Sequence, residues 1–281
     1  MVSCVRIGVV PKLNSPEALQ LAKLVLKSAE NKGLAAFLDA RARELVSWDK
    51  FFYVGKDSVD MIIVVGGDGT VLNTLHLLGD SDVPIATIRY GRRGFLCDVP
   101  PYEYSEMISR IASGDYKLVE YMRLKGEVKG VGETPPALNE LAIVSSGSGR
   151  AKVTRLYVHK DGEELYRRLV GDGVIVATPV GSTAYSLAAG GPVVDPSMRA
   201  LIVTPLASIT LCTRPVILPP NSEVRVTVAR DSPEALLIVD GAFSVTLKPR
   251  DSVIIREYRK PAKFARFYLG DYYVRIFERC L

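Results

Sequence analysis

The sequence predicts two domains: an α/β domain built on an open parallel sheet over residues 1–100, and a β-rich domain over residues 101–255. In the first hundred residues, apolar runs of strand length alternate with stretches of helical periodicity, which is typical of βαβ units. Beyond Pro100 and Pro101 the chain changes to short strand patterns separated by Gly, Pro, Asn and Asp. The basic, aromatic tail over 256–281 has helical apolar spacing near its end, and we expect this helix to cover the first domain.

Each element of the first domain has its own signal. The helix that begins at Ser15-Pro16 has a capping residue and a proline in its first turn, and its apolar stripe ends at Asn31-Lys32-Gly33. The run Met61–Val65 is entirely apolar, as expected for a strand buried on both faces of a parallel sheet. The other elements expected here are strands over Val5–Val10, Leu34–Leu38 and Val83–Ile88 and a helix from the turn after Val65 through Leu78; one more helix, over Tyr102–Ala112, is expected just after the boundary.

The second domain is predicted as a series of strands, because short apolar runs recur between turn residues. These runs are Leu141–Val144, Val153–His159, Leu165–Val170, Val174–Ala177, Glu223–Ala229, Leu236–Val239 and Val253–Tyr258. The tail then places Tyr273, Ile276, Phe277 and Cys280 at helical spacing, which predicts an amphipathic helix.

Composition narrows the class of protein. The 281 residues are 48% hydrophobic and 24% charged, which is ordinary globular composition. No apolar run approaches the ~20 residues that span a bilayer, and the first residues lack the pattern of a secretory signal, so we expect a cytoplasmic protein without a membrane partner. Most of the formal net charge of +5 lies in the tail, where the apolar stripe favours a packed helix over a nucleic-acid-binding surface.

The cysteines and histidines do not form a metal-ligand pattern. They are scattered along the chain, without a Cys-x-x-Cys pair, at Cys4, His76, Cys97, His159, Cys212 and Cys280. The sequence therefore predicts free thiols and no metal site built from these residues.

The sharpest motif is Gly66-Gly67-Asp68-Gly69-Thr70, which follows the Met61–Val65 strand and precedes a helical stretch. Ligands of open α/β sheets bind beyond the carboxyl ends of the strands, where glycines let a phosphate approach the backbone and a helix N-terminus favours anions. Asp68 suits binding magnesium or accepting a proton from an attacking hydroxyl. The structural alternative is a tight turn, for which Asp-Gly is common. The motif is neither a Walker A loop nor GxGxxG.

Two further features lie in the second domain. Gly171-Asp172-Gly173 opens an apolar strand that leads into a Pro/Gly turn, and we expect Ser182-Thr183 to open a small-residue helix with Tyr185 available for stacking. A capped helix that packs closely on its neighbours is the structural alternative. Asn139-Glu140 precedes the Leu141–Val144 strand, and an amide beside a carboxylate can hold a ribose diol.

Together, the GGDGT loop, the Asn-Glu pair and the run TPVGSTAYSLAAGGP resemble the NAD kinase family, with further matches at Gly94-Phe95-Leu96, Arg214-Pro215-Val216 and Val239-Asp240-Gly241. The resemblance implies transfer of the ATP γ-phosphate to the 2′-hydroxyl of the adenosine ribose of NAD, with Mg²⁺ or another divalent cation as cofactor. It also implies a Rossmann-like first domain completed by the tail over 256–281, a sandwich-like second domain, and a homodimer or homotetramer. Polyphosphate as an alternative donor stays open.

The resemblance also implies roles for single positions. Asp68 matches the catalytic base, and Gly66, Gly67, Gly69 and Thr70 match the turn that binds the phosphates of ATP. The implied NAD-binding positions are Asp68, Gly69, Asn139, Glu140, Arg150, Asp172, Thr183, Ala184, Tyr185, Ser186 and Ala207. Within this set, Asp172 matches a carboxylate near the nicotinamide end, and Ala207 matches a backbone contact between subunits.

Some positions depart from the family pattern, namely Arg89, Val170, Val180, Ile209 and Ala242. Since the matched carboxylates and the Asn-Glu pair are intact, the departures bear on substrate selectivity and not on the reaction class. A lipid kinase of the diacylglycerol type shares the glycine turn, but its usual Gly-Thr-Gly-Asn-Asp segment is absent. A non-catalytic dinucleotide-binding regulator is the other alternative, and it has no need of the carboxylate of Asp68.

Overall fold

The computed structural model describes residues 5–90, 94–146, 153–210 and 212–268, together with Gly270 and Tyr273. The chain divides into two compact units, one of Met1–Glu120 with Ala262–Leu281 and one of Tyr121–Pro261. These divisions lie later than the predicted boundaries near residues 100 and 255. The helix α3 (Tyr104–Ser113) sets the first boundary, because its buried residues belong to the apolar core of the first unit.

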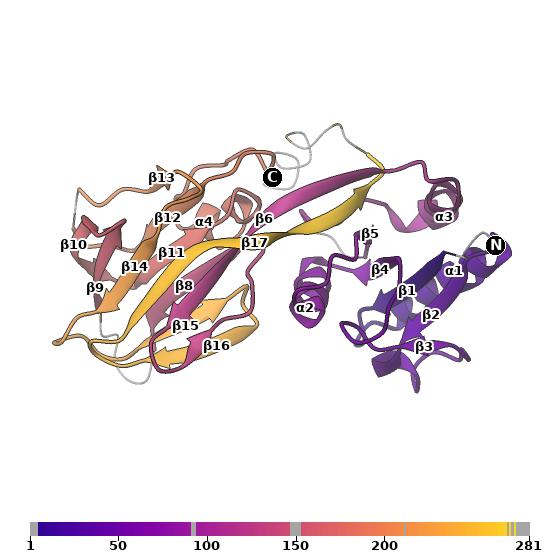
Figure 1. Ribbon diagram of the computed structural model, residues 1–281, viewed down its shortest axis with the longest axis horizontal. Coiled ribbons are helices and arrows are strands. Elements are labelled where there is room, and N and C mark those ends of the chain that lie inside the picture. The colour runs from indigo at the N-terminus through magenta and orange to yellow at the C-terminus, as the bar shows by residue number, and fades with distance from the viewer. Residues whose placement is uncertain are drawn as a thin grey trace. The chain divides into compact units, whose positions relative to one another are not determined.

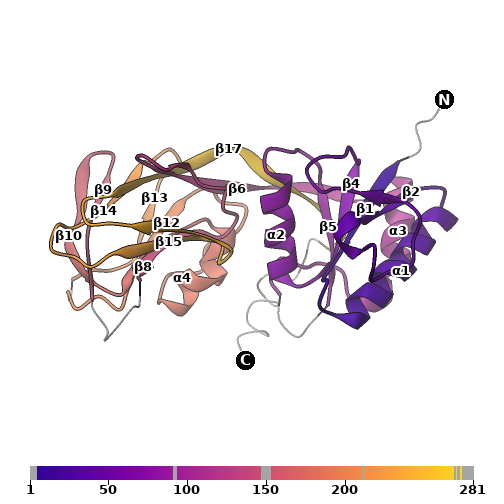
Figure 2. The same cartoon turned by 90° about the horizontal axis from the view of Figure 1, so that it is seen from below.

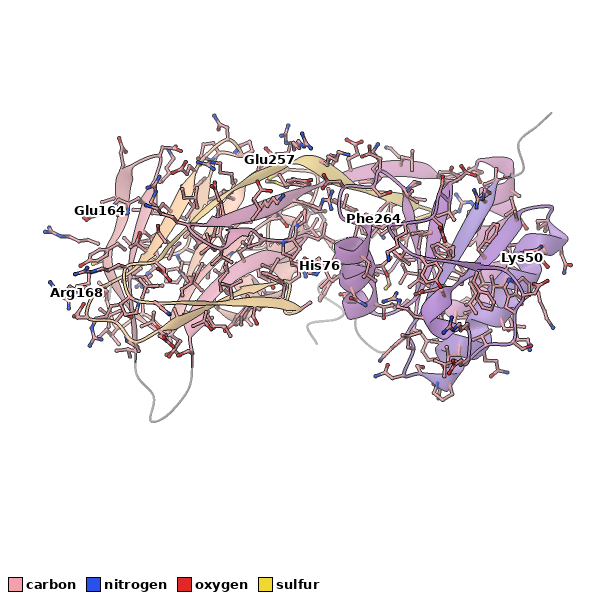
Figure 3. The ribbon with its side chains drawn as sticks, turned by 60° about the horizontal axis from the view of Figure 1, so that its bottom comes forward. Lys50, His76, Glu164, Arg168, Glu257 and Phe264 are labelled. Atoms are coloured by element: carbon pink, nitrogen blue, oxygen red, sulfur yellow. The ribbon has the colours of Figure 1, made fainter. Side chains whose placement is uncertain are left out.

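The first unit contains a parallel sheet (Figure 1). Its strands are β1 (Arg6–Pro11), β2 (Ala35–Asp39), β3 (Phe51–Phe52), β4 (Met61–Gly66) and β5 (Ile85–Arg89). They lie in the order β3-β2-β1-β4-β5, and every neighbouring pair is parallel. The end of the long strand β17 (Ser252–Arg266) continues this sheet, where Phe264 pairs with Ile85. Phe264 is labelled in Figure 3.

Helices cover both faces of this sheet (Figure 2). The helices α1 (Pro16–Asn31) and α3 (Tyr104–Ser113) share one core with Met61, Ile63 and Val65 of β4. The helix α2 (Asp68–Leu78) lies on the other face. All residues of β4 are buried, as the uniformly apolar run predicts for a strand between two helical layers. Short 3₁₀ turns cover Ala40–Ala42 and Pro101–Glu103.

The ends of α1 follow the local signals in the sequence. The hydroxyl of Ser15 accepts a hydrogen bond from the backbone N–H of Ala18 at 3.3 Å, and Pro16 occupies the first turn. At the other end Gly33 has φ +76°, a left-handed conformation that stops the helix.

The second unit contains two packed antiparallel sheets. One has the order β10-β9-β14-β17, with β6 and β7 attached through β17, and the other has the order β13-β12-β11-β8-β15-β16. The strands are β6 (Lys117–Val128), β7 (Gly132–Glu133), β8 (Glu140–Ser145), β9 (Thr154–Lys160), β10 (Glu163–Gly171), β11 (Gly173–Ala177), β12 (Leu201–Leu206), β13 (Val216–Leu218), β14 (Val224–Val228), β15 (Ala235–Val239) and β16 (Phe243–Leu247). Alternate residues of both sheets form one apolar core, including Leu141, Val176, Val226 and Ile255.

The segment after β11 differs from its prediction. Ser182 and Thr183 do not open a helix but lie in a 3₁₀ turn over Val180–Thr183, and the helix α4 covers only Tyr185–Ala188. Both hydroxyls bond backwards, Ser182 to the carbonyl of Pro179 at 2.6 Å and Thr183 to the carbonyl of Val180 at 3.2 Å. A hydroxyl that bonds three residues back favours this tighter turn over a helix start.

The predicted tail helix lies almost wholly outside the described residues, since Tyr273 alone of its apolar stripe is described. In the part of the chain that the structure describes, no helix combines the length and the apolar character needed to cross a membrane.

Candidate functional site

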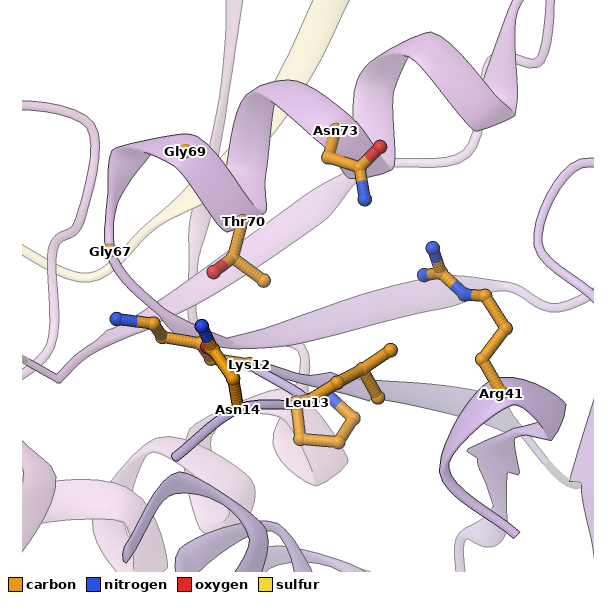
Figure 4. Close-up of a pocket in the computed structure, with 9 residues that line it drawn as sticks. Lys12, Leu13, Asn14, Arg41, Gly67, Gly69, Thr70 and Asn73 are labelled. Atoms are coloured by element: carbon orange, nitrogen blue, oxygen red, sulfur yellow. The ribbon is translucent and has the colours of Figure 1, made fainter. Parts of the chain in front are cut away.

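The glycine turn lies at the carboxyl end of β4 and forms the start of α2 (Figure 4). Gly67 is the N-cap residue, and Asp68 is the first residue of the helix. A Cβ on Gly66 would lie 2.5 Å from the hydroxyl oxygen of Thr70, so this position requires glycine. The turn therefore presents backbone N–H groups at the positive end of a helix, which is an arrangement that binds anions.

The carboxylate of Asp68 is held by the backbone of a neighbouring segment. It accepts hydrogen bonds from the N–H of Phe95 at 2.7 Å and from the N–H of Leu96 at 3.0 Å, one on each oxygen. A Cβ on Gly94 would lie 3.1 Å from the same carboxylate, so this segment passes close to it. Each carboxylate oxygen keeps a second lone pair, so Asp68 is fixed in orientation and can still accept a proton.

A cavity of about 340 Å³ lies beside the turn. It is lined by Pro11, Lys12, Leu13, Asn14, Arg41, Gly67, Gly69, Thr70 and Asn73, from the β1–α1 loop, the first 3₁₀ turn and α2 (Figure 4). Arg41 is paired with the buried carboxylate of Asp39 at 2.5 Å. Lys12, by contrast, is exposed on the β1–α1 loop. The cavity thus combines a helix N-terminus, cationic groups and polar side chains, which suits a phosphate chain.

In the second unit, Asn139 and Glu140 are held from two sides at the start of β8. The carboxylate of Asp240 accepts backbone hydrogen bonds from Leu138 at 2.8 Å, Asn139 at 2.8 Å and Glu140 at 3.1 Å. On the other side, the backbone N–H of Thr178 donates to the carbonyl of Asn139 at 2.8 Å, and the Thr178 hydroxyl donates to the carbonyl of Leu138 at 2.6 Å. The backbone of this pair is therefore fixed independently of its side chains.

The close approach of the TPVGST run to the backbone of Asn139 explains why position 181 is a glycine. A Cβ on Gly181 would lie 2.1 Å from the carbonyl oxygen of Asn139, so no other residue fits without displacing the backbone. The glycine of the TPVGST run therefore permits the contact between this run and the Asn-Glu pair.

The side chain of Glu140 is buried and only partly satisfied. It accepts a hydrogen bond from the backbone N–H of Tyr185, at the start of α4, while its Oε2 atom has no hydrogen-bond partner. Burial, reinforced by the negative charge of Asp240, raises the pKa of Glu140 to about 8. A ligand that donates hydroxyl hydrogen bonds would satisfy this carboxylate, and a ribose diol is such a ligand.

Of the predicted dinucleotide-binding residues, Asp68 and Gly69 lie in the first unit, and those described in the second unit form two sets at opposite ends of one sheet. Ala177 pairs with Glu140, whereas Gly173, at the other end of the same two strands, pairs with Val144. Asp172 and Ala207 belong to this second end, where the N–H of Asp172 donates to the carbonyl of Leu206 at 2.9 Å. The length of β8, roughly 17 Å at the usual rise per residue, separates the two sets.

The two units correspond to two family models. The ATP-NAD kinase N-terminal domain matches residues 7–116, and the ATP-NAD kinase C-terminal domain matches residues 138–267. The chain belongs to the ATP-NAD kinase family. An NAD kinase of Thermococcus sibiricus is 37% identical over 265 residues, which are 93% of this chain and 94% of that protein.

Two solved structures extend the comparison. An NAD kinase from Archaeoglobus fulgidus in complex with ATP has a TM-score of 0.77 and 26% identity, with 98% of each chain covered. Yeast NADH kinase complexed with NADH has a TM-score of 0.89 over 98% of this chain and 87% of that chain, and its 24% identity shows a common fold. The predicted family, the fold class and the assignment as a kinase are confirmed.

The hydroxyls predicted as ligand contacts have internal partners in this NAD kinase family member. Besides the bond of Thr183 to Val180, Ser186 shares a hydrogen bond with Thr204 at 2.8 Å. Both residues are buried, while the side chain of Tyr185 is 45% exposed. Of this run, Tyr185 therefore presents the side chain that can reach a ligand, and Ala184 contributes backbone. Arg150 lies outside the described residues.

The positions that depart from the family pattern occupy different environments. Val180 is buried in the 3₁₀ turn, so it fills space where a hydroxyl is usual. Ile209 is 68% exposed beside the second set, and its backbone N–H donates to the carbonyl of Val170 at 3.0 Å. Arg89 ends β5, and Ala242 follows the Asp240-Gly241 turn.

Sequence reasoning assigned no role to Asp240, Thr178 or Lys12. Asp240 belongs to the segment Val239-Asp240-Gly241 that matches the family. An Asp-Gly pair directly after a buried strand is a signal for a turn, and it could have indicated one here. The residue that Asp240 holds lies about a hundred positions away in sequence, so the partner could not be read from a local pattern.

The residues at the glycine turn fit one mode of magnesium binding. In the described residues no group of three or more His, Cys, Asp and Glu side chains is placed to hold a metal ion. Mg²⁺ commonly takes one or two carboxylates together with phosphate oxygens and waters. The free lone pairs of Asp68 supply such a carboxylate beside the phosphate-sized cavity. The site therefore fits a cation bound to the phosphates of a nucleotide, and not one held by the protein alone.

Proposed function

We propose that this protein transfers the γ-phosphoryl group of ATP to the 2′-hydroxyl of the adenosine ribose of NAD, producing NADP and ADP. The observation that carries the proposal is the match of both family domains together with an Asp68 carboxylate fixed at the N-terminus of α2. A regulator that only binds dinucleotides would not need this carboxylate.

The first unit binds the donor in this proposal. The phosphate chain of ATP occupies the cavity beside the glycine turn, whose lining includes Gly67, Gly69 and Thr70. Lys12 contributes positive charge. The relative from Archaeoglobus fulgidus was solved with ATP, which supports this choice of donor. A divalent cation, when bound, would neutralise charge on the phosphate oxygens.

The second unit binds the acceptor. The carboxyl group of Glu140 exchanges hydrogen bonds with the ribose hydroxyls, the amide of Asn139 adds a donor and an acceptor, and Tyr185 stacks on the adenine. A hydrogen bond from a diol to the buried Oε2 atom of Glu140 removes the free-energy cost of leaving this atom without a partner.

The reaction then needs alignment and one proton acceptor. The 2′-oxygen forms a bond to the γ-phosphorus while the bond from that phosphorus to the bridging oxygen breaks, and ADP leaves. Asp68 accepts the hydroxyl proton as this bond forms. Because its carboxylate is already oriented by Phe95 and Leu96, no rotation is needed when the acceptor arrives.

We further propose a homodimer or homotetramer that acts in the cytoplasm. The separation of Asp172 and Ala207 from Glu140 by the length of β8 supports this assembly, since a second copy can bring its own Asp172 to the nicotinamide end of the dinucleotide. The cation and the donor range, including polyphosphate, belong to the same proposal.

The direct test uses purified protein with NAD, ATP and magnesium. NADP is measured with an NADP-specific dehydrogenase, and phosphorus NMR identifies the 2′-phosphate. Formation of NADP that requires both substrates supports the function. Phosphorylation of a diacylglycerol, or binding of NAD without NADP formation, would overturn it. Parallel assays with polyphosphate in place of ATP define the donor range.

A further inference from the structure

The segment whose backbone holds Asp68, residues 94–98, is itself held by the residues at and after the end of β17. Both segments belong to the first unit. The carbonyl of Leu96 accepts a hydrogen bond from Nη1 of Arg266 at 2.7 Å, and the carboxylate of Asp98 accepts one from the N–H of Phe267 at 2.8 Å. The chain segment that donates to Asp68 is therefore anchored on the last residues of a strand that lies 170 positions away in sequence.

The anchor on Leu96 is strong for a single contact. Arg266 is 8% exposed, and its guanidinium lies 4.6 Å from the centre of the Phe264 ring. A charged donor buried in this way forms a shorter and stronger bond to a carbonyl than a neutral donor does. The hydroxyl of Thr87 donates to the same carbonyl at the longer distance of 3.2 Å.

The two bonds on Leu96 are mechanically linked. Its N–H donates to Asp68, and its carbonyl accepts from Arg266, so the two peptide groups flanking one Cα are both fixed. Loss of the guanidinium would let the carbonyl rotate, and the N–H direction toward Asp68 would change with it. A carboxylate that accepts a proton in an aligned reaction is sensitive to such a displacement.

We propose that Arg266 is a positioning residue for the catalytic base: through Leu96 it sets the orientation of the Asp68 carboxylate, and so it governs turnover without contacting either substrate. This inference rests on the proposed function. The effect of Arg266 on the segment that holds Asp68 can also be measured without any enzymatic activity. The inference about Arg266 and the proposed function can therefore fail separately.

Arg110 provides a matched control. It is also an arginine of the first unit that binds the returning segment, since its Nη1 donates to the carbonyl of Phe267 at 3.1 Å and its guanidinium lies 5.3 Å from the Phe267 ring. Among the described residues its side chain donates to Asp115 and Phe267, and not to the segment of Leu96. Replacement of Arg110 therefore weakens the same segment of chain without removing the bond on Leu96.

The experiment compares Arg266→Met, Arg266→Lys and Arg110→Met in the full chain. Met keeps much of the apolar packing and removes the donor, whereas Lys can still donate to the carbonyl. We expect Arg266→Met to lower kcat about tenfold or more, with the KM values for NAD and ATP within about twofold of wild type. Arg266→Lys should recover part of kcat, and Arg110→Met should leave kcat near wild type.

Two additional measurements keep the inference testable if Arg266→Met does not fold. The variant Thr87→Val removes the second donor on Leu96, together with the acceptor of the Asp98 N–H, and should lower kcat in the same direction by a smaller factor. Amide hydrogen exchange at the N–H of Leu96 should be faster in Arg266→Lys and Thr87→Val than in wild type, whether or not the protein forms NADP.

The inference is overturned if Arg266→Met and Arg110→Met lower kcat by the same factor, since this would show a general loss of stability. It is also overturned if the Arg266 variants raise KM and leave kcat unchanged, or if exchange at the N–H of Leu96 is unchanged in every variant. If the wild-type protein forms no NADP while exchange responds as expected, the proposed function fails and the link from Arg266 to Leu96 stands.

Discussion

The carboxylate of Asp240 accepts a hydrogen bond from the backbone N–H of Asn139 at 2.8 Å, across 101 positions of sequence. The same carboxylate accepts from the neighbouring N–H groups of Leu138 and Glu140, so one side chain satisfies three buried donors. Asp240 itself has φ 47°, a left-handed conformation that places it in a turn after β15. The turn thus fixes the start of β8, on which the proposed acceptor-binding side chains stand.

The first prediction follows from this relationship. Asp240→Asn replaces an acceptor oxygen by an NH₂ group that faces a backbone N–H and removes a negative charge. We expect the KM for NAD to rise about tenfold, since a lost bond to a charged group costs about 1.5–3 kcal/mol, part of which Asn recovers. The KM for ATP should stay within about twofold of wild type.

Asp251→Asn is the control for this variant, because the carboxylate of Asp251 accepts a backbone bond from Lys248 at 2.8 Å in an exposed turn of the same unit. Steady-state kinetics with each substrate varied in turn give the measurement. Equal changes in both KM values, or a similar change in Asp251→Asn, would contradict the assignment of Asp240 to acceptor binding.

The second prediction concerns the base. Asp68→Asn keeps the size of the side chain and one acceptor oxygen but cannot take a proton. We expect kcat to fall by at least about 10², while the affinity for NAD in a calorimetric titration changes little. Asp57→Asn, which alters a carboxylate that accepts the N–H of Tyr53 in an exposed turn, should leave kcat unchanged. Near-normal turnover in Asp68→Asn would exclude Asp68 as the base.

The third prediction concerns the donor cavity. Lys12→Met removes a positive charge from the lining while keeping a long apolar side chain. We expect the KM for ATP to rise about fivefold to tenfold, because an interaction between an ammonium and a phosphate chain contributes about 1 kcal/mol or more. The increase should shrink at high salt. Lys50→Met is the control, since Lys50 pairs with Glu30 at the surface of the same unit. An unchanged KM for ATP would place the phosphate chain elsewhere.

The extent of sequence-based prediction differs between local and long-range features. The strand β4, the glycine turn and the start of α2 follow from adjacent residues, so their arrangement was predicted. The strand β12 was not predicted, because Pro205 interrupts its apolar run. Its partner β13 pairs only with Leu201–Val203, so Pro205 needs no donor on that side.

The contacts between residues of the site were harder to predict from the sequence than the helices and strands that carry them. The bond of Arg266 to Leu96 and that of Asp240 to Asn139 join segments far apart in sequence, and neither residue type nor spacing indicates the partner. The expected helix start at Ser182-Thr183 was wrong for a local reason, because both hydroxyls had backbone carbonyls within reach.

The fourth prediction concerns the buried carboxylate of Glu140, whose pKa is raised to about 8 by burial and by the charge of Asp240. In the unfolded chain this group has an ordinary pKa near 4.5. The folded state therefore holds a proton that the unfolded state has lost, and the free energy of unfolding falls as pH rises from about 4.5 to about 8, by at most about 1.4 kcal/mol per pH unit.

Glu140→Gln should remove this contribution. Urea unfolding between about pH 5 and about pH 8 should give a flatter dependence of the free energy of unfolding on pH than in wild type. Glu163→Gln, at an exposed position of β10, should leave the wild-type slope unchanged. A Glu140→Gln slope equal to that of wild type would contradict the raised pKa.

The fifth prediction concerns the two ends of the sheet. If the Asp172 of one copy serves the dinucleotide held by Glu140 of another, then Glu140→Ala and Asp172→Ala each impair every site of a homo-oligomer. In a mixed pair of chains, however, one site receives Glu140 from one chain and Asp172 from the other, and both are intact.

Co-expression of the two variants with different affinity tags, followed by tandem purification, should therefore restore a large part of wild-type activity, up to about half. Light scattering on the purified mixture verifies that it is an oligomer. Each variant co-expressed with a differently tagged copy of itself gives the baseline. Activity of the mixed species no higher than this baseline would show that Asp172 and Glu140 of one chain serve the same site, or that Asp172 has no part in it.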